Sequence, residues 1–82
     1  MISFKSSSLY FEDERLGLKN NTIRKIDYDD ERFEKLIDMM CKQKYDNEYI
    51  SISCVEFPFD FFIRQIKHVT KWNDFLIITW RT

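Results

Sequence analysis

The chain has 82 residues, which is enough for one domain, spanning 1–82, near the lower size limit for independent folding. Hydrophobic residues make up 44% of it and aromatic residues 17%, so it can bury a core without a metal, disulfides or a cofactor, and none is expected. Thirteen basic residues face fourteen acidic ones, and a net charge of −1 excludes the general attraction to nucleic acid that strongly basic proteins show, although not a local basic patch.

The two cysteines point to an intracellular protein. Cys41 and Cys54 lack the spacing of a structural zinc site or a disulfide framework, so we expect free, mostly buried thiols and no metal. No apolar run approaches the ~20 residues that span a bilayer, and Met1 to Lys5 do not resemble a signal peptide. The expected location is the cytoplasm of a bacterium or of a phage-infected host, with no membrane partner.

A short helix is predicted from Leu9 to Leu16, with both leucines and one of the two aromatics, Tyr10 or Phe11, on one face. Ser7 or Ser8 can cap its start, and Gly17 follows its end, where a positive φ is most easily accepted. The next element is a strand predicted over Thr22–Ile26, because Thr22, Ile23 and Ile26 are β-branched residues that favour strands.

A second helix is predicted from Asp29 to Met40, fading near Lys42. Asp29 or Asp30 can cap its start. Spacings of three and four, typical of an amphipathic helix, separate the apolar residues Phe33, Leu36, Ile37, Met40 and Cys41.

The rest of the chain has the alternating pattern of strands. Tyr49–Val55 alternates with a period of two, and the segment around Pro58 interrupts it. Phe61–Val69 fits a helix or a strand, and a strand is favoured because it leads through a turn at Asn73-Asp74 into a clear final strand, Phe75–Trp80. Two early helices and a late antiparallel meander predict an α+β fold.

One motif in this chain has chemical content. Residues Gly17 to Arg24 have the form G-x-K-x-x-T-x-R, entered from the first helix. This segment resembles the signature of the ASCH domains, a branch of the PUA-like superfamily. The resemblance implies a small antiparallel β-barrel or curved sheet with two helices, and a cleft that binds RNA or a nucleoside-like ligand at the motif. The residues expected to bind the ligand are Lys19, Asn21, Thr22, Arg24 and Arg64.

The resemblance also implies a catalytic alternative. The form with Thr is similar to that of small ASCH amidohydrolases that act on acetylated cytidine, in which the motif Lys and Thr are the proposed base and nucleophile; here these are Lys19 and Thr22. A threonine hydroxyl needs a neighbouring base before it becomes a good nucleophile, and a shielded lysine can act as one. Those enzymes use a downstream Glu as well, for which Glu48 and Glu56 are the candidates.

A purely structural interpretation of the motif remains open. Gly17 can simply end a helix, the residues from Lys19 to Asn21 can form a solvated turn, and Thr22 can start a strand because it is β-branched. His68, the only histidine, lies in no catalytic pattern and is expected to be structural.

A third hypothesis is a protein-binding role. Small single-domain chains without clear enzymatic residues are typical of phage accessory proteins that bind a host protein. The loop that carries Phe57 and Phe59, or the second helix, would supply the contact surface. A basic strip for nucleic acid is also possible if neighbouring strands bring together Arg24, Lys25, Arg64, Lys67 and Lys71.

Overall fold

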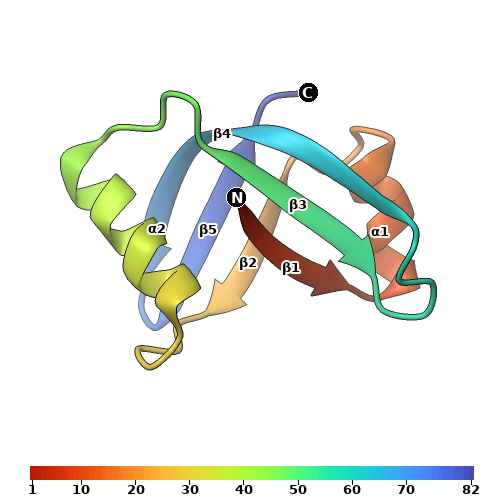
Figure 1. Cartoon of the computed structure of the whole chain (residues 1–82), viewed down its shortest axis with the longest axis horizontal. Helices are drawn as coiled ribbons and strands as arrows, with labels where there is room; N and C mark the ends of the chain where they lie inside the picture. The colour runs from red at the N-terminus through yellow and green to blue at the C-terminus, as the bar shows by residue number, and fades with distance from the viewer.

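The computed structural model describes all 82 residues, which form two helices and five strands (Figure 1). In chain order the elements are β1 (Ile2–Ser6), α1 (Ser8–Arg15), β2 (Asn21–Lys25), α2 (Glu31–Lys42), β3 (Tyr49–Cys54), β4 (Phe61–Trp72) and β5 (Phe75–Trp80). The helices lie toward opposite ends of the sheet (Figure 1).

The sheet is a five-stranded, mixed and curved one with strand order β1-β3-β4-β5-β2, which confirms the predicted α+β fold of a curved sheet with two helices. The meander β3-β4-β5 and the pairing of β2 with β5 are antiparallel. Strand β1 was not predicted, and it pairs parallel with β3. Its alternating burial, with Ile2, Phe4 and Ser6 turned inward, is the pattern of a half-buried strand.

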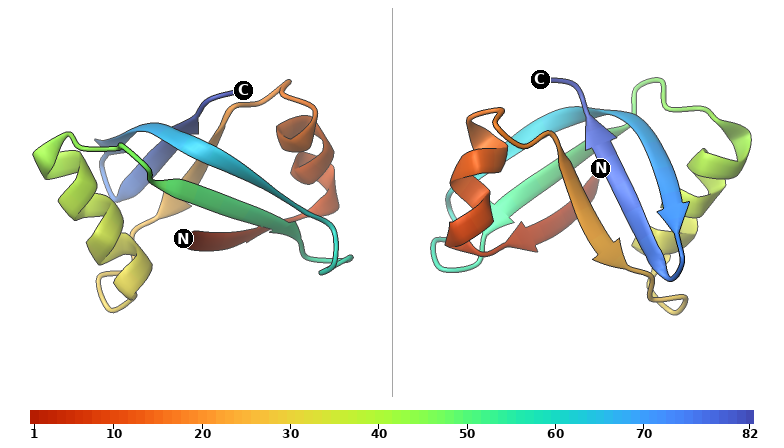
Figure 2. Two further views of the ribbon diagram at one scale, coloured as in Figure 1. Left: turned by 45° about the horizontal axis from the view of Figure 1, so that its top comes forward. Right: turned by 180° about the vertical axis from the view of Figure 1, so that it is seen from behind.

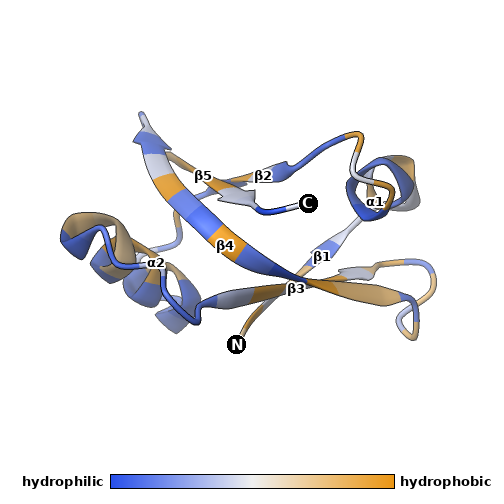
Figure 3. Cartoon of the chain, turned by 90° about the horizontal axis from the view of Figure 1, so that it is seen from above, coloured by the Kyte–Doolittle hydropathy of each residue, from blue (hydrophilic) through white to orange (hydrophobic).

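The curvature comes from β4, which joins the two halves of the sheet. Its first part, Phe61–Gln65, pairs with β3, and its second part, from Ile66 on, pairs with β5. The register with β5 shifts between Ile66 and His68, and such a bulge bends a strand and increases its twist. Seen from above, β4 crosses from the β3 side to the β5 side, so the sheet forms a half-barrel (Figures 2 and 3). The edge strands β1 and β2 are not paired with each other, and we call the gap between them the seam.

The core fills the inside of this half-barrel. Sixteen buried hydrophobic residues form a single cluster. Leu36 of α2 and the strand residues Ile52, Leu76 and Ile78 are completely buried. Burial of each such side chain stabilises the fold by roughly 1.5–3 kcal/mol. The best-packed part of the molecule is therefore the meander with α2 against it.

Helix α2 agrees with its sequence pattern except at two residues: Met39 is buried although it was not in the predicted set, and Cys41 is exposed. The side chain of Asp30 caps it by accepting a 2.9 Å hydrogen bond from the Arg32 backbone N–H. The buried residues are Phe33, Leu36 and Met39. Because each residue turns a helix by about 100°, Cys41 lies roughly 200° from Met39 and is exposed. The expectation of mostly buried thiols is thus wrong for Cys41 and right for Cys54.

Helix α1 begins after its N-cap Ser7, and Gly17 beyond its end has the expected positive φ of 82°. The predicted apolar face is wrong for Leu9 and Leu16, which are exposed, whereas Phe11, one of the two aromatics, is buried. The face that packs over β1 and β3 carries Phe11 and, three residues later, the fully buried Glu14. A charged residue on the inner face of an eight-residue helix is the most unexpected feature of the fold.

The remaining ambiguous segments agree with the favoured predictions. Phe61–Val69 is part of a strand, β4, and the turn after it has Asn73 at a φ of 52°. In β2, Thr22 faces inward and is buried while Ile23 is exposed, which explains the imperfect apolar alternation of this strand. Neither helix has the length and apolarity that crossing a membrane requires.

Candidate functional site

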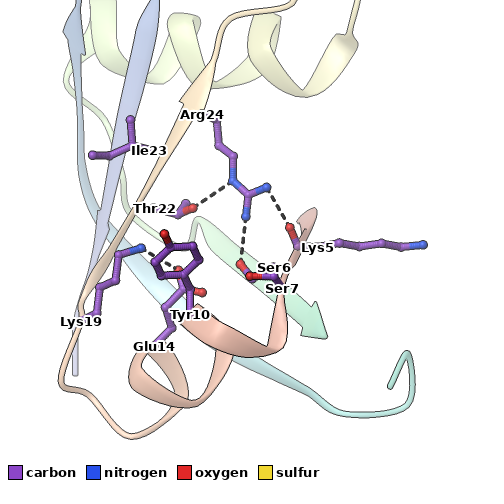
Figure 4. A pocket seen from close by; sticks show the side chains of 9 residues that line it. All are labelled: Lys5, Ser6, Ser7, Tyr10, Glu14, Lys19, Thr22, Ile23 and Arg24. Carbon is purple, nitrogen blue, oxygen red and sulfur yellow. Dashed lines mark hydrogen bonds and ion pairs between the residues drawn. The ribbon is translucent and has the colours of Figure 1, made fainter. Parts of the chain in front are cut away.

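A cavity of about 420 Å³ lies at the seam, where β2 faces the end of β1 and the start of α1 (Figure 4). It is lined by nine residues: Lys5, Ser6, Ser7, Tyr10, Glu14, Lys19, Thr22, Ile23 and Arg24. Three of them, Lys19, Thr22 and Arg24, are the defining polar residues of the G-x-K-x-x-T-x-R motif. The motif therefore brings its polar side chains to one cavity.

Arg24 links the two edge strands across the seam. Its Nε donates to Thr22 Oγ1 at 2.9 Å on its own strand, while its terminal nitrogens donate to the Lys5 carbonyl at 2.8 Å and to Ser6 Oγ at 3.0 Å on β1 (Figure 4). Burial lowers the pKa of Arg24 below its ordinary value and the charge of Glu14 opposes this shift, yet an arginine stays protonated under ordinary conditions. A cation that makes no ion pair thus borders the cavity.

Two buried hydroxyl groups flank this guanidinium. Thr22 is 3% exposed and Ser6 is 7% exposed, and each hydroxyl oxygen accepts a hydrogen bond from Arg24. A hydroxyl that accepts such a bond keeps its own O–H for another acceptor. This side of the cavity is therefore rich in hydrogen-bond donors.

The opposite side of the cavity carries a buried carboxylate. Glu14 Oε2 accepts a 3.2 Å hydrogen bond from Lys19 Nζ, and the side chain of Glu14 is fully buried. The second oxygen, Oε1, has no hydrogen-bond partner. Lys19 Nζ also lies 5.5 Å from the centre of the Tyr10 ring, so Lys19 interacts with both Glu14 and Tyr10 (Figure 4). The sequence prediction missed Glu14, and its only signal is the spacing of three from Phe11, which is weak.

Two of the predicted ligand-binding residues lie elsewhere. The Asn21 side chain donates to Asn20 Oδ1 at 3.4 Å, and it does not line the cavity. Arg64 donates to the Arg15 carbonyl at 3.0 Å, and its guanidinium lies 4.8 Å from the centre of the Phe62 ring. Arg64 therefore contacts the far end of α1 and not the cavity.

The predicted basic strip does not form across neighbouring strands. Arg24 and Lys25 are on β2, whereas the other three residues are on β4, and β5 lies between these strands. The basic residues that do lie near Arg24 are Lys5 of β1 and Arg32 of α2. Neither was singled out in the sequence, since β1 was not predicted at all.

Neither downstream glutamate reaches the cavity. Glu48 pairs with Lys35 at 3.8 Å. Glu56 accepts hydrogen bonds from the Ser8 backbone N–H at 2.9 Å and from Cys54 Sγ at 3.4 Å. A hydrogen bond from its own backbone N–H, together with those two, lowers the pKa of Glu56 below its ordinary value of 4.5. The carboxylate at the motif is instead Glu14, which precedes the motif.

Comparison with known proteins assigns no family to this arrangement. No protein-family model matches the chain, and no curated protein is significantly similar to it. The described side chains include no group of three or more His, Cys, Asp and Glu residues suited to a metal ion. The geometry of the cavity is thus the main basis for a functional hypothesis.

Proposed function

We propose that the seam cavity binds a nucleoside-like ligand, either free or as one nucleotide of an RNA. The observation that carries this proposal is that Lys19, Thr22 and Arg24 line one cavity together with the aromatic ring of Tyr10. The volume of about 420 Å³ lies within the roughly 300–1,000 Å³ of small-molecule sites. The resemblance of the motif to ASCH domains supports the same class of ligand.

The side chains of the cavity suit the chemistry of a nucleoside. Tyr10 is half-exposed at the cavity and offers a flat face on which a base can stack. Ribose hydroxyls and ring nitrogens are acceptors for the O–H groups of Thr22 and Ser6 and for the Lys19 ammonium. The mixture of an aromatic ring with several donors favours a nucleoside over a purely apolar ligand.

A two-dimensional amide NMR titration tests the proposal. Nucleosides, nucleotides and a short RNA are added in turn to the labelled protein, and we expect shifts confined to residues 17–24, the end of β1 and the start of α1. Thr22→Ala should weaken binding, while the matched control Thr70→Ala, an exposed position on β4, should not. A well-dispersed spectrum that none of these ligands perturbs would refute the proposal.

Hydrolysis of an acetylated nucleoside is a second candidate for the same cavity. The observation that favours it is that a lysine, a threonine hydroxyl and a carboxylate (Lys19, Thr22 and Glu14) line the cavity together. For Lys19 to take the Thr22 proton it would have to leave Glu14, to which it donates at 3.2 Å. Release of acetate from acetylated cytidine, abolished in Thr22→Ala and retained in Thr22→Ser, would support hydrolysis; binding without release supports the first proposal alone.

A protein-binding role rests on a different region, the loop between β3 and β4. Phe59 is 96% exposed and Phe57 is 62% exposed, which is unusual for phenylalanine and favours contact with an apolar surface of another protein. In this hypothesis a host protein binds the loop. Photo-crosslinking from position 59 should capture one partner. An excess of unlabelled wild-type protein should reduce this capture, whereas an excess of Phe57→Ser/Phe59→Ser should not. If both proteins reduce the capture equally, the hypothesis is refuted.

A further inference from the structure

A second groove of about 450 Å³ adjoins the seam cavity. It is lined by Ser3, Phe4, Lys5, Arg24, Arg32 and Ser53, which come from β1, β2, α2 and β3. Lys5 and Arg24 line both hollows, so the groove and the cavity meet at these two residues. A ligand that fills the cavity can therefore extend past Arg24 into the groove.

The groove has an excess of positive charge. The guanidinium carbons of Arg24 and Arg32 lie 4.9 Å and 4.4 Å from the centre of the same Phe4 ring. Arg32 pairs with Asp30 at 2.7 Å, whereas neither Lys5 nor Arg24 has a carboxylate within ion-pair distance, and no acidic residue lines the groove. Of the three basic residues that line the groove, only Arg32 is ion-paired, although Glu14 and Asp27 act at longer range on Arg24 and Arg32.

An oxyanion is the ligand chemistry that relieves this excess. Two guanidinium groups near one ring repel each other. Burial is the main cause of the lowered pKa of Arg24; the charge of Glu14 opposes this shift, and the repulsion by Arg32 adds to it to a smaller extent. Arg24 donates N–H groups to Thr22, Lys5 and Ser6, and its guanidinium has further N–H groups that can donate to a ligand. Planar guanidinium groups match the geometry of phosphate oxygens, and the hydroxyls of Ser3 and Ser53 on the groove wall add donors.

We propose that this groove is a phosphate subsite, in which Arg32, Lys5 and Arg24 bind the phosphate of the ligand whose nucleoside part occupies the seam cavity. The inference rests on the proposed function and adds Arg32, a residue of α2 outside the motif, to the site. The phosphate is either the monoester of a free nucleotide or a diester of an RNA strand.

The test measures the affinities of a nucleoside, its 5′-monophosphate, inorganic phosphate and a short RNA by calorimetry at two salt concentrations. The monophosphate should bind about tenfold or more tightly than the nucleoside, and the difference should shrink at high salt. Arg32→Gln should remove most of this gain and leave the affinity for the nucleoside unchanged, because Arg32 does not line the cavity. The matched control Lys35→Gln removes one ion-paired cation of the same helix that does not line the groove, and it should keep the gain.

The outcomes separate the two proposals. Equal affinities for nucleoside and monophosphate would overturn the phosphate subsite and leave nucleoside binding intact. Inorganic phosphate that binds wild type but not Arg32→Gln, without any nucleoside binding, would support the subsite and refute the seam cavity. RNA that binds much more tightly than the monophosphate, with a steeper salt dependence, would identify the diester as the source. If Arg32→Gln unfolds, Lys5→Gln is tested in its place. If that variant still binds the monophosphate more tightly than the nucleoside by the full wild-type factor, the result counts against the subsite.

Discussion

The meander β3-β4-β5 and the seam between β1 and β2 are held together in different ways. In the meander, backbone ladders join the strands, and fully buried side chains such as Ile52 and Leu76 pack beneath them. At the seam no ladder joins the edge strands; Arg24 and Arg32 donate instead to carbonyls of β1, Lys5 and Ser3. Side-chain donors can exchange a protein acceptor for a ligand acceptor, whereas a buried ladder cannot. The contacts of this half-barrel that can adapt to a ligand therefore lie at the seam.

The largest effect should come from breaking the meander. Leu76→Ala removes a completely buried side chain from β5 and should lower the free energy of unfolding by about 2–5 kcal/mol through lost burial and a cavity. Ile23→Ala, at an exposed position of β2 beside the seam, should change it by less than about 0.5 kcal/mol. Urea denaturation followed by tryptophan fluorescence measures both. Equal losses of unfolding free energy in the two variants would mean that the seam stabilises the fold as much as the meander does.

The next effect should come from the buried carboxylate at the seam. Lys19→Met leaves Glu14 buried without its 3.2 Å partner, which should cost about 2–3 kcal/mol, at the low end for a buried pair because the Lys19 side chain is 33% exposed. Replacing Glu14 as well, in Glu14→Leu/Lys19→Met, should recover part of the loss. A double-mutant cycle in urea checks this, and strictly additive losses would show that the two side chains are not coupled.

A smaller effect is expected at Arg24. Lys cannot reproduce the three directed hydrogen bonds of the Arg24 guanidinium, so Arg24→Lys should cost about 1–2 kcal/mol. It should also speed amide hydrogen exchange along β1 more than along β3. Arg64→Lys, at a guanidinium that contacts α1 and not the seam, is the matched control. Uniform exchange across the sheet in Arg24→Lys would contradict a specific bridging role.

The meander was more predictable from the sequence than the seam, for a physical reason. Alternation over Tyr49–Val55 and Phe75–Trp80 reports burial on one face of a strand, which is local information. Strand β1 depends on its parallel pairing with residues of β3 that lie 48 positions later in the chain, and its five residues carry too little pattern to reveal it. The motif predicted that Lys19, Thr22 and Arg24 lie together, but the position of Arg32 depends on how α2 packs.

Glu14 was missed for a related reason. A carboxylate in a short helix with several acidic neighbours is normally a solvated residue, and only the packing of α1 over β1 and β3 makes this one buried. Arg64 was expected to bind the ligand, yet it donates to the Arg15 carbonyl at the end of α1. Residue type and spacing predict which face of an element a side chain occupies, but not which elements then meet.

The smallest effect should be the pH dependence of stability that Glu56 causes. Glu56 links the loop after β3 to the start of α1 through its hydrogen bond from the Ser8 backbone N–H. The pKa of Glu56 is lower in the folded chain than its ordinary value of 4.5, so the folded state binds fewer protons there than the unfolded state. Its contribution to stability is therefore present above about pH 4.5 and is lost as the pH falls through the lower pKa of the folded state.

Glu56→Gln should unfold at less urea than wild type at pH 6. This difference in urea midpoint should narrow at pH 3, because protonated Glu56 is as uncharged as Gln. A gap of the same size at both pH values would mean that the contact between the loop and α1 depends on the shape of the Glu56 side chain and not on its charge.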